Sequence, residues 1–369
     1  MREVPDLMQL MKQLRSTPAM LSKQAIQQSA QVMGRATQML SPAQLYALPG
    51  DDTAAIACGE HYQLLAIEGM LPTFVEAAPW FAGWSAVMAN VSDITAMGGR
   101  ATAVVNAYWH HEQDAAQQVL AGIRAACEAY GLILAGGHTS LADGNPTAVA
   151  VAITGMASKL LSSLHVAPGQ VIAMAVDLEG QWHANSTYWK AFEGVPAERL
   201  RSKLEVLPRL AEAQLLHAAK DISNAGVLGS LLMLLEATGS GAHIDLSRLP
   251  SPPDAEPGRW LQVFPSYGFL ITLDEKDWPN VQAAFAFEGV CCERIGKVNA
   301  SAALTVEADS QRVEFWNLAE QVFTGFSYAH LDLSPLHFSQ EHCHARCQLH
   351  DSLAQRQRSR RLLTLDGDL

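Results

Sequence analysis

Short strand patterns alternate with longer helical patterns along most of this chain. The strand patterns are runs rich in Val, Ile and Ala, and the helical patterns repeat apolar residues every three or four positions. Strand patterns occur at 62–68, 101–109, 132–135, 147–155, 171–176, 242–246, 267–273 and 290–298, and helical patterns at 79–90, 114–130, 198–220, 227–237 and 278–288. Strands that alternate with helices in both halves of a chain predict an α/β or α+β fold.

Length and composition predict two domains with packed cores. The chain has 369 residues, of which 49% are hydrophobic and 17% charged, and a domain usually has about 100–200 residues. We expect a helical segment at 1–40, an N-terminal domain at 41–160, a C-terminal α/β domain at 161–325 and a tail at 326–369.

The charge and the apolar runs restrict the partners of this protein. A formal net charge of −12 argues against nucleic-acid binding, which needs a basic face. No apolar run approaches the roughly 20 residues of a membrane span, and residues 1–14 lack the apolar core of a signal peptide. The six cysteines are too sparse for a disulfide framework. We therefore expect a cytoplasmic protein without nucleic-acid or membrane partners.

The stretch 89–100, Ala-Asn-Val-Ser-Asp-Ile-Thr-Ala-Met-Gly-Gly-Arg, sets polar groups between a helix and a glycine turn. Asn90, Ser92 and Asp93 follow an apolar helical run and precede a β-branched strand. Polar side chains held on rigid elements suit a binding site. The alternative is an ordinary helix end, with Ser92 or Asp93 as a cap and Gly98 as the stop.

Two other stretches suit metal or phosphate binding. Gly50-Asp51-Asp52-Thr53 places two carboxylates and a hydroxyl before a strand, and oxygen ligands of this kind suit magnesium. The alternative is a solvated turn. Gly136-Gly137-His138-Thr139 follows a short strand, and its glycines would let backbone N–H groups approach a ligand. The alternative there is a simple strand-to-loop turn.

The last part of the chain contains several potential metal ligands. Their spacing matches no closed tetrahedral zinc site, so we favour a loose terminus over a metal centre. These residues are His337, His342, Cys343, His344, Cys347 and His350.

Four motifs occur in an order that resembles a known superfamily. They are Gly-Asp-Asp-Thr-Ala, Asn-Val-Ser-Asp-Ile-Thr-Ala-Met-Gly, Gly-Gly-His-Thr and Asp-Ile-Ser-Asn-Ala-Gly, within about residues 45–300. The chain resembles the superfamily of aminoimidazole ribonucleotide synthetase, thiamine-monophosphate kinase and selenophosphate synthetase. The sequences of these motifs are most similar to those of thiamine-monophosphate kinase, and the chain also looks like a subgroup described only as synthetase-related.

The resemblance implies a two-domain, synthetase-like fold whose N-terminal sheets pair in a homodimer and form a barrel. It also implies that ATP binds between domains and between subunits, with magnesium ions on its phosphates. Asp93 and Asp221 would be catalytic residues, and Glu68 stands where the kinases carry an Asp. By matching motifs, the metal ligands would be Asp51, Asp52, Glu68, Asp93 and Asp221, and the nucleotide contacts would be Asp51, Asp52, Thr53, Asn90, Gly136, Gly137, His138 and Thr139.

The predicted function is an ATP- and magnesium-dependent phosphotransferase that acts on a small molecule. Phosphoryl transfer depends on positioning and on neutralising phosphate charge, and carboxylates from separate loops can hold magnesium ions for this purpose. One alternative is an ATP-dependent cyclo-ligase, and another is a non-catalytic nucleotide-binding protein. His138 and Asn224 stand where the family usually has acids, and imidazole is a poor magnesium ligand, which favours the non-catalytic alternative.

Overall fold

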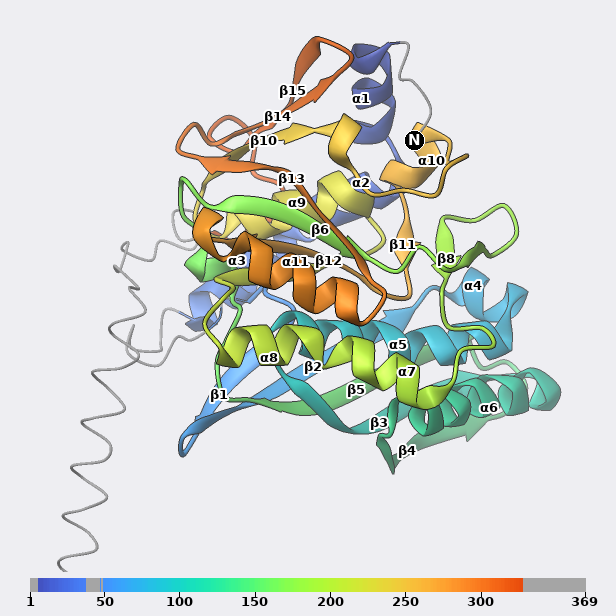
Figure 1. Ribbon diagram of the computed structural model, residues 1–369. Coiled ribbons are helices and arrows are strands. Elements are labelled where there is room, and N and C mark those ends of the chain that lie inside the picture. The colour runs from blue at the N-terminus through green and yellow to red at the C-terminus, as the bar shows by residue number, and fades with distance from the viewer. Residues whose placement is uncertain (1–5, 38–46, 48, 328–369) are drawn as a thin grey trace, which may run out of the picture. The chain divides into compact units, whose positions relative to one another are not determined.

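Two separate β-sheets, each with its own helices, organise the chain (Figure 1). The computed structural model describes residues 6–37, 47 and 49–327. The N-terminal sheet has the strand order β1-β2-β5-β3-β4, and the C-terminal sheet has the order β15-β14-β10-β13-β6-β12-β9. A small third sheet has the order β11-β8-β7. The mixed α/β class with two sheets is confirmed, whereas a barrel formed with a second chain stays a prediction.

Three short helices precede the N-terminal sheet. Asp6 and Thr17 cap the first two by accepting hydrogen bonds from the backbone N–H groups of Gln9 and Met20, as N-cap residues do. Leu7, on the first helix, packs into the core of the C-terminal sheet. The helices are α1 (Leu7–Arg15), α2 (Pro18–Gln24) and α3 (Gln27–Thr37).

The N-terminal sheet is covered by helices on one face. Its helices α5 and α6 pack closely, because a Cβ at Gly83 would collide with the carbonyl oxygen of Val119 and a Cβ at Gly122 with that of Trp80. The strands are β1 (Ala54–Cys58), β2 (His61–Met70), β3 (Arg100–His110), β4 (Ile133–Leu141) and β5 (Ala148–Ala157), and the helices are α4 (Pro72–Ala77), α5 (Pro79–Ala96) and α6 (Gln113–Tyr130).

The opposite face of this sheet, which we call the outer face, exposes large apolar side chains. Residues that alternate with them along the strands are buried against α5 and α6. A contiguous apolar face on a soluble chain often marks a protein interface. The apolar residues of the outer face are Ile56, Leu65, Ile67, Val105, Ile133 and Met156.

The C-terminal sheet is buried on both faces at its strands β6, β9 and β12. Its strands are β6 (Val171–Val176), β9 (Ala218–Asp221), β10 (Gly241–Asp245), β12 (Gly268–Leu273), β13 (Cys291–Asn299), β14 (Ala303–Ala308) and β15 (Gln311–Asn317). The remaining elements are α7 (Ala197–Leu204), α8 (Val206–Glu212), α9 (Gly226–Glu236), α10 (Pro257–Leu261), α11 (Trp278–Phe287), the 3-10 turns η2 (Ser163–His165), η3 (Leu246–Arg248) and η4 (Glu275–Asp277), and the short strands β7 (Gln181–Trp182), β8 (Tyr188–Lys190) and β11 (Phe264–Pro265).

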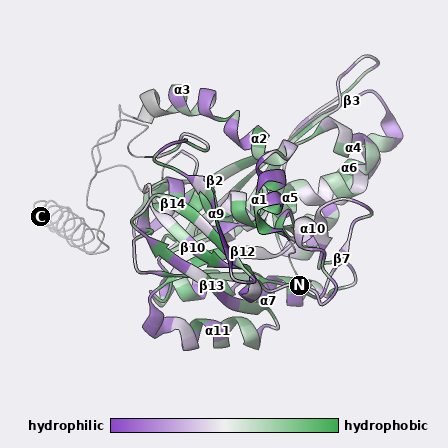
Figure 2. Cartoon of the chain, turned by 90° about the horizontal axis from the view of Figure 1, so that it is seen from above, coloured by the Kyte–Doolittle hydropathy of each residue, from purple (hydrophilic) through white to green (hydrophobic). Residues whose placement is uncertain are grey.

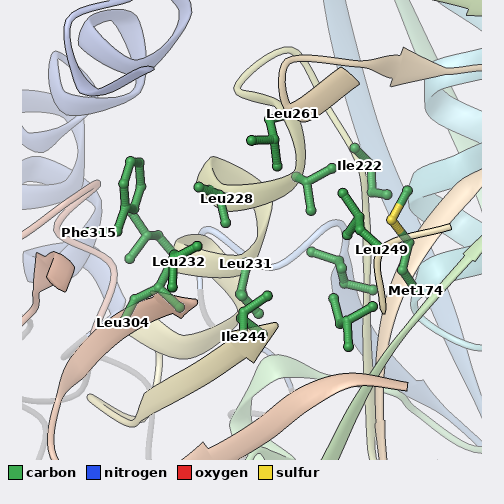
Figure 3. Close-up of a cluster of buried hydrophobic side chains, with 14 of the residues drawn as sticks. Met174, Ile222, Leu228, Leu231, Leu232, Ile244, Leu249, Leu261, Leu304 and Phe315 are labelled. Atoms are coloured by element: carbon green, nitrogen blue, oxygen red, sulfur yellow. The ribbon is translucent and has the colours of Figure 1, made fainter. Parts of the chain in front are cut away.

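Helix α9 supplies much of the core on one face of the C-terminal sheet. The helix is strongly hydrophobic in Figure 2. In Figure 3 its Leu231 and Leu232 lie near Ile244 of β10 and Leu304 of β14. Helices α8 and α11 supply the core on the other face, where Leu207 and Phe285 are fully buried.

Helix α5 connects the two sheets. It packs on β2 and β5 of the N-terminal sheet and also contacts β9 of the C-terminal sheet (Figure 1). Arg100, at the start of β3, adds ion pairs to Glu205 at 2.9 Å and to Glu212 at 2.6 Å. The polar face of α5 is therefore held against the end of β9.

Three sequence predictions of element bounds are wrong. The helix predicted at 79–90 continues to Ala96, so Ser92 and Asp93 lie inside it and cap nothing, and the chain turns at Gly98 as expected. The pattern 198–220 is α7, α8 and then β9, because Gln214 adopts a φ of +56° that ends the helix. Residues 136–139 lie within β4, since pairing along β3 extends this edge strand past its glycines.

Candidate metal and nucleotide site

Three buried aspartates meet where α5 lies against the C-terminal sheet. Asp52 precedes β1, Asp93 lies in α5 and Asp221 ends β9. One carboxylate oxygen from each lies within 4.8 Å of the other two. Asp93 is 6% exposed and Asp221 is 3% exposed. We call these residues the aspartate triad.

Each member of the triad is held by ordinary secondary structure. Asp93 lies one helical turn after Asn90 on the same face of α5. Asp221 is fixed because β9 pairs with β12, where Asp221 stands opposite Phe269. Asp221 also donates its backbone N–H to Asp52 Oδ2 at 3.2 Å.

The loop before β1 is held by a segment from the far end of the described chain. The buried Glu236 carboxylate accepts hydrogen bonds from the backbone N–H groups of Phe323 and Thr324 at 2.7 and 2.8 Å, and from the Thr324 hydroxyl at 2.5 Å. This clamp places Phe326 against Gly50, where a Cβ would lie 2.5 Å from the phenylalanine side chain. The clamp therefore supports the turn that presents Asp52.

Lys220 lies among the triad and was missed by the sequence analysis. Its ammonium forms ion pairs with Asp52 Oδ1 and Asp221 Oδ1, and its side chain is 9% exposed. The sequence places Lys220 at the end of a helical pattern, which hides its position in a strand. The sequence signal that could have indicated Lys220 as a site residue is its position directly before the motif that begins at Asp221.

Burial and mutual repulsion raise the pKa values of the carboxyl groups. Burial first, and then the charge of Asp221, raises the pKa of Asp52 to about 8, although Lys220 opposes this shift. Burial, Asp221 and Glu68 raise the pKa of Asp93 well above its ordinary value. Burial would lower the pKa of Lys220, but the surrounding carboxylates outweigh it and raise that pKa. The site thus holds more acidic groups than its one ammonium can neutralise, so protons or a bound cation must balance the remaining charge.

The donor set of the triad fits magnesium. Carboxylate oxygens are hard ligands that Mg²⁺ prefers, and this ion keeps several waters alongside one or two protein carboxylates. Asp93 Oδ2 is buried and has no hydrogen-bond partner among the described residues. An oxygen in this state is costly unless a ligand pairs with it. The triad can therefore hold a magnesium ion and leave positions open for phosphate oxygens.

Three other predicted site residues lie close to the triad in sequence or space. Glu68, on the covered face of β2, has a pKa raised by burial and then by the charge of Asp221. Asn90 donates from Nδ2 to the carbonyl oxygens of Ala86 and Val151, at 2.7 and 2.8 Å, which ties α5 to β5. Thr53 is buried, and its hydroxyl has no partner within the described chain.

The remaining predicted contacts are not brought to the triad within one chain. Asp51 instead binds η2, accepting from Ser162 Oγ at 2.5 Å and from the backbone N–H of Ser163 at 3.0 Å. Gly136, Gly137, His138 and Thr139 lie on β4, at the opposite edge of the sheet from β1. Three strand spacings separate β4 from β2, or about 14 Å. A contribution from these four residues would need a second chain.

A large cavity lies elsewhere, lined by residues of η3, β13 and α11. It has a volume of about 730 Å³, with Arg248, Arg294 and Trp278 in its walls. None of the triad residues lines it. The chemistry of the triad, and not the size of a cavity, therefore identifies the candidate site.

Two predictions concern regions or properties outside this site. The His- and Cys-containing stretch beyond residue 327 lies outside the described residues. Within residues 6–37 and 49–327, none of the helices is long and apolar enough to cross a membrane.

Comparisons with known proteins support the family resemblance. Models described as AIR synthase related protein, N-terminal domain and C-terminal domain, match residues 50–157 and 168–309. The uncharacterized protein sll0787 of Synechocystis sp. is 40% identical over 279 residues, which cover 75% of this chain and 86% of that protein. The uncharacterized protein MJ0640 of Methanocaldococcus jannaschii is 32% identical over 240 residues, covering 64% and 74%. A selenide, water dikinase of Aeromonas hydrophila is 24% identical over 282 residues, covering 70% and 80%.

Solved structures share this fold at low identity. T. maritima PurL complexed with ATP has a TM-score of 0.62 at 19% identity, covering 72% of this chain and 46% of PurL, so the chain spans about half of that protein. AaThiL complexed with AMPPCP and TMP has a TM-score of 0.57 at 18% identity, covering 76% of this chain and 93% of AaThiL. Because the two family models together match well over half of its residues, the chain belongs to the AIR synthase related protein family.

Proposed function

We propose that this protein is an ATP- and magnesium-dependent phosphotransferase that acts on a small molecule. The observation that carries the proposal is the aspartate triad, three buried carboxylates from three separate elements within 4.8 Å. Two structures with a similar fold also support the proposal, because PurL was solved with ATP and AaThiL with AMPPCP and TMP. We infer that ATP and Mg²⁺ are the cofactors of this chain as well.

The residues present suit the demands of phosphoryl transfer. Magnesium, when bound, neutralises charge on the transferred phosphoryl group. Asp52, Asp93 and Asp221 would hold it and orient the triphosphate. Asp93 and Asp221 are the catalytic residues of this proposal, because their carboxylates would hold the magnesium ion that neutralises charge on the reacting phosphates. Burial of the triad excludes water, which strengthens each electrostatic interaction there.

The proposal includes a homodimer formed through the outer face of the N-terminal sheet. Six exposed apolar residues lie on that face, and β4 leaves one edge without a neighbouring strand in the described chain. Pairing two such faces would remove apolar surface from water. It would also give Gly136, Gly137, His138 and Thr139 a route to the partner's nucleotide.

Calorimetric titration of ATP, with and without Mg²⁺, tests the proposal. We expect magnesium-dependent binding to the native chain and at least about a tenfold loss in Asp93→Asn, which keeps the side-chain shape but removes the charge. Thr95→Val is the matched control, because Thr95 is buried on the same helix and bonds only Val91 within it. If the native chain binds no ATP with Mg²⁺ present, the proposed function is abandoned.

A cyclo-ligase is the second candidate, favoured by the family models, which are described as related to AIR synthase. A kinase and a cyclo-ligase would use the same metal and nucleotide. They differ in product, because a kinase leaves a phosphorylated small molecule, whereas a cyclo-ligase releases inorganic phosphate and a ring. Analysis of the products from a substrate screen distinguishes them.

A further inference from the structure

Lys220 pairs with two of the three residues of the aspartate triad. Its ammonium contacts Asp52 Oδ1 and Asp221 Oδ1, and these two residues and Asp93 are the ones that offer oxygens to an ion. The second Asp52 oxygen is also engaged, by the backbone N–H of Asp221 at 3.2 Å. Asp93 Oδ2 is a fully buried oxygen of the triad that has no partner among the described residues.

An ammonium and a divalent cation cannot share these oxygens. The three oxygens lie within 4.8 Å of one another, so a metal bound to them would lie only a few ångströms from the ammonium in its present place. Like charges at such a separation repel strongly in a buried site. The Lys220 stem is a flexible four-carbon chain, so the ammonium can withdraw without a change in the backbone.

We propose that Lys220 is an internal counter-ion of the aspartate triad, and that a divalent cation must displace its ammonium in order to bind. This inference rests on the proposed function in taking the triad as the metal site. In the metal-free protein the Lys220 ammonium pairs with Asp52 and Asp221 and so offsets the repulsion between these two buried carboxylates. The same contacts lower the affinity for metal, because the metal replaces an interaction that is already made.

The test is a titration of Mn²⁺ into the full chain without nucleotide, with free Mn²⁺ measured by its electron paramagnetic resonance signal. We expect Lys220→Met to bind Mn²⁺ at least about tenfold more tightly than the native chain, the scale of a lost charge-assisted hydrogen bond. Lys203→Met is the matched control. Lys203 is also a buried lysine with a carboxylate partner, Asp177 at 2.5 Å, but it lies outside the triad. Unchanged or weaker Mn²⁺ binding in Lys220→Met overturns the proposal.

A second measurement uses the native chain, in case Lys220→Met does not fold. An amine-reactive reagent labels exposed lysines, and mass spectrometry maps the modified positions. We expect Lys220 to be protected without metal and to be labelled several times faster with saturating Mn²⁺, while Lys203 stays protected in both. Equal protection of Lys220 with and without Mn²⁺ overturns the proposal.

These outcomes are separable from those of the proposed function, since neither measurement contains ATP. If the chain binds no ATP but shows both Mn²⁺ effects, the counter-ion proposal stands and the phosphotransferase proposal fails. If the chain binds ATP with Mg²⁺ but shows neither Mn²⁺ effect, the phosphotransferase proposal stands and the counter-ion proposal fails.

Discussion

Replacing Asp93 by Asn should stabilise the metal-free protein and abolish its response to magnesium. Asp93 is buried, and its Oδ2 has no partner within the described chain. Burial and the charges of Asp221 and Glu68 raise its pKa, so its ionised form is unfavourable in the folded state. Asparagine has nearly the same shape without the charge.

The size of the effect follows from the spacing of the triad. Two ionised carboxylate oxygens no more than 4.8 Å apart repel by at least about 3 kcal/mol at an effective dielectric constant of about 20. Attraction to Lys220 offsets part of this repulsion. We therefore expect Asp93→Asn to increase the free energy of unfolding by about 1–3 kcal/mol near pH 8 without metal, which raises Tm by several degrees.

The pH dependence has a definite sign. The folded-state pKa of Asp93 is above its unfolded value of 3.8, so the stability that its protonated form provides is complete below that value. This stability is lost as the pH rises through the folded-state pKa. The advantage of Asp93→Asn over the native chain should therefore be larger near pH 8 than near pH 5.5.

Thermal unfolding at these two pH values, with and without Mg²⁺, measures both effects. Thr95→Val is again the control and should follow the native chain. Two results would refute the reasoning. The first is that Asp93→Asn is less stable than the native chain near pH 8 without metal, which would mean that the carboxylate is favourably paired. The second is that magnesium stabilises the variant as much as the native chain.

Three other predictions test the clamp, the interface and the departures from the family pattern. Glu236→Gln removes the charge that holds Thr324 and should lower the free energy of unfolding by about 2–3 kcal/mol, as measured by urea denaturation. An unchanged urea midpoint would contradict a stabilising role for the clamp. Ile67→Glu on the outer face should convert a dimer to monomers in sedimentation analysis, while the equally apolar control Phe287→Glu on α11 should not. The double variant His138→Asp, Asn224→Asp should change magnesium-dependent ATP turnover by less than about threefold, whereas a large gain from an inactive native chain favours the non-catalytic alternative.

The fold class and the core strands could be predicted from sequence because their patterns are local. Apolar runs such as 171–176 and 267–273 follow directly from the burial of β6 and β12 on both faces. Helix α6 has an apolar stripe and ends at Gly131 in a left-handed conformation, which is a local signal as well. In each of these elements, tertiary packing agrees with local preference.

The bounds of α5, β4 and β9 could not be predicted because non-local contacts decide them. Asn90, Ser92 and Asp93 are polar, so burying a helix that continues through them is unfavourable without partners such as the Val151 carbonyl of β5, which accepts from Asn90. The glycines at 136 and 137 weaken a strand locally, and pairing with β3 outweighs this. Such partners are known only once the strands have been placed.

The triad could be predicted in part, because each aspartate lies in a recognisable motif. Motif order indicated Asp52, Asp93 and Asp221, and these are the residues that meet. It also indicated Asp51, which binds Ser162 and Ser163 instead. Adjacent residues face different directions at the start of a strand, and the sequence alone does not say which of two neighbouring carboxylates points inward.

The charge balance of the site connects Lys220 to the departures from the family pattern. The motif resemblance implies that His138 and Asn224 stand in place of acids, so the chain would offer fewer anionic ligands than that pattern. Lys220 adds a positive charge among the three carboxylates that remain. A buried site must be close to neutral, because uncompensated charge there is costly. The internal ammonium reduces the number of divalent cations needed for neutrality at the triad. An acid missing at position 138, which could reach a triad only from a second chain, would act in the same direction on metal binding.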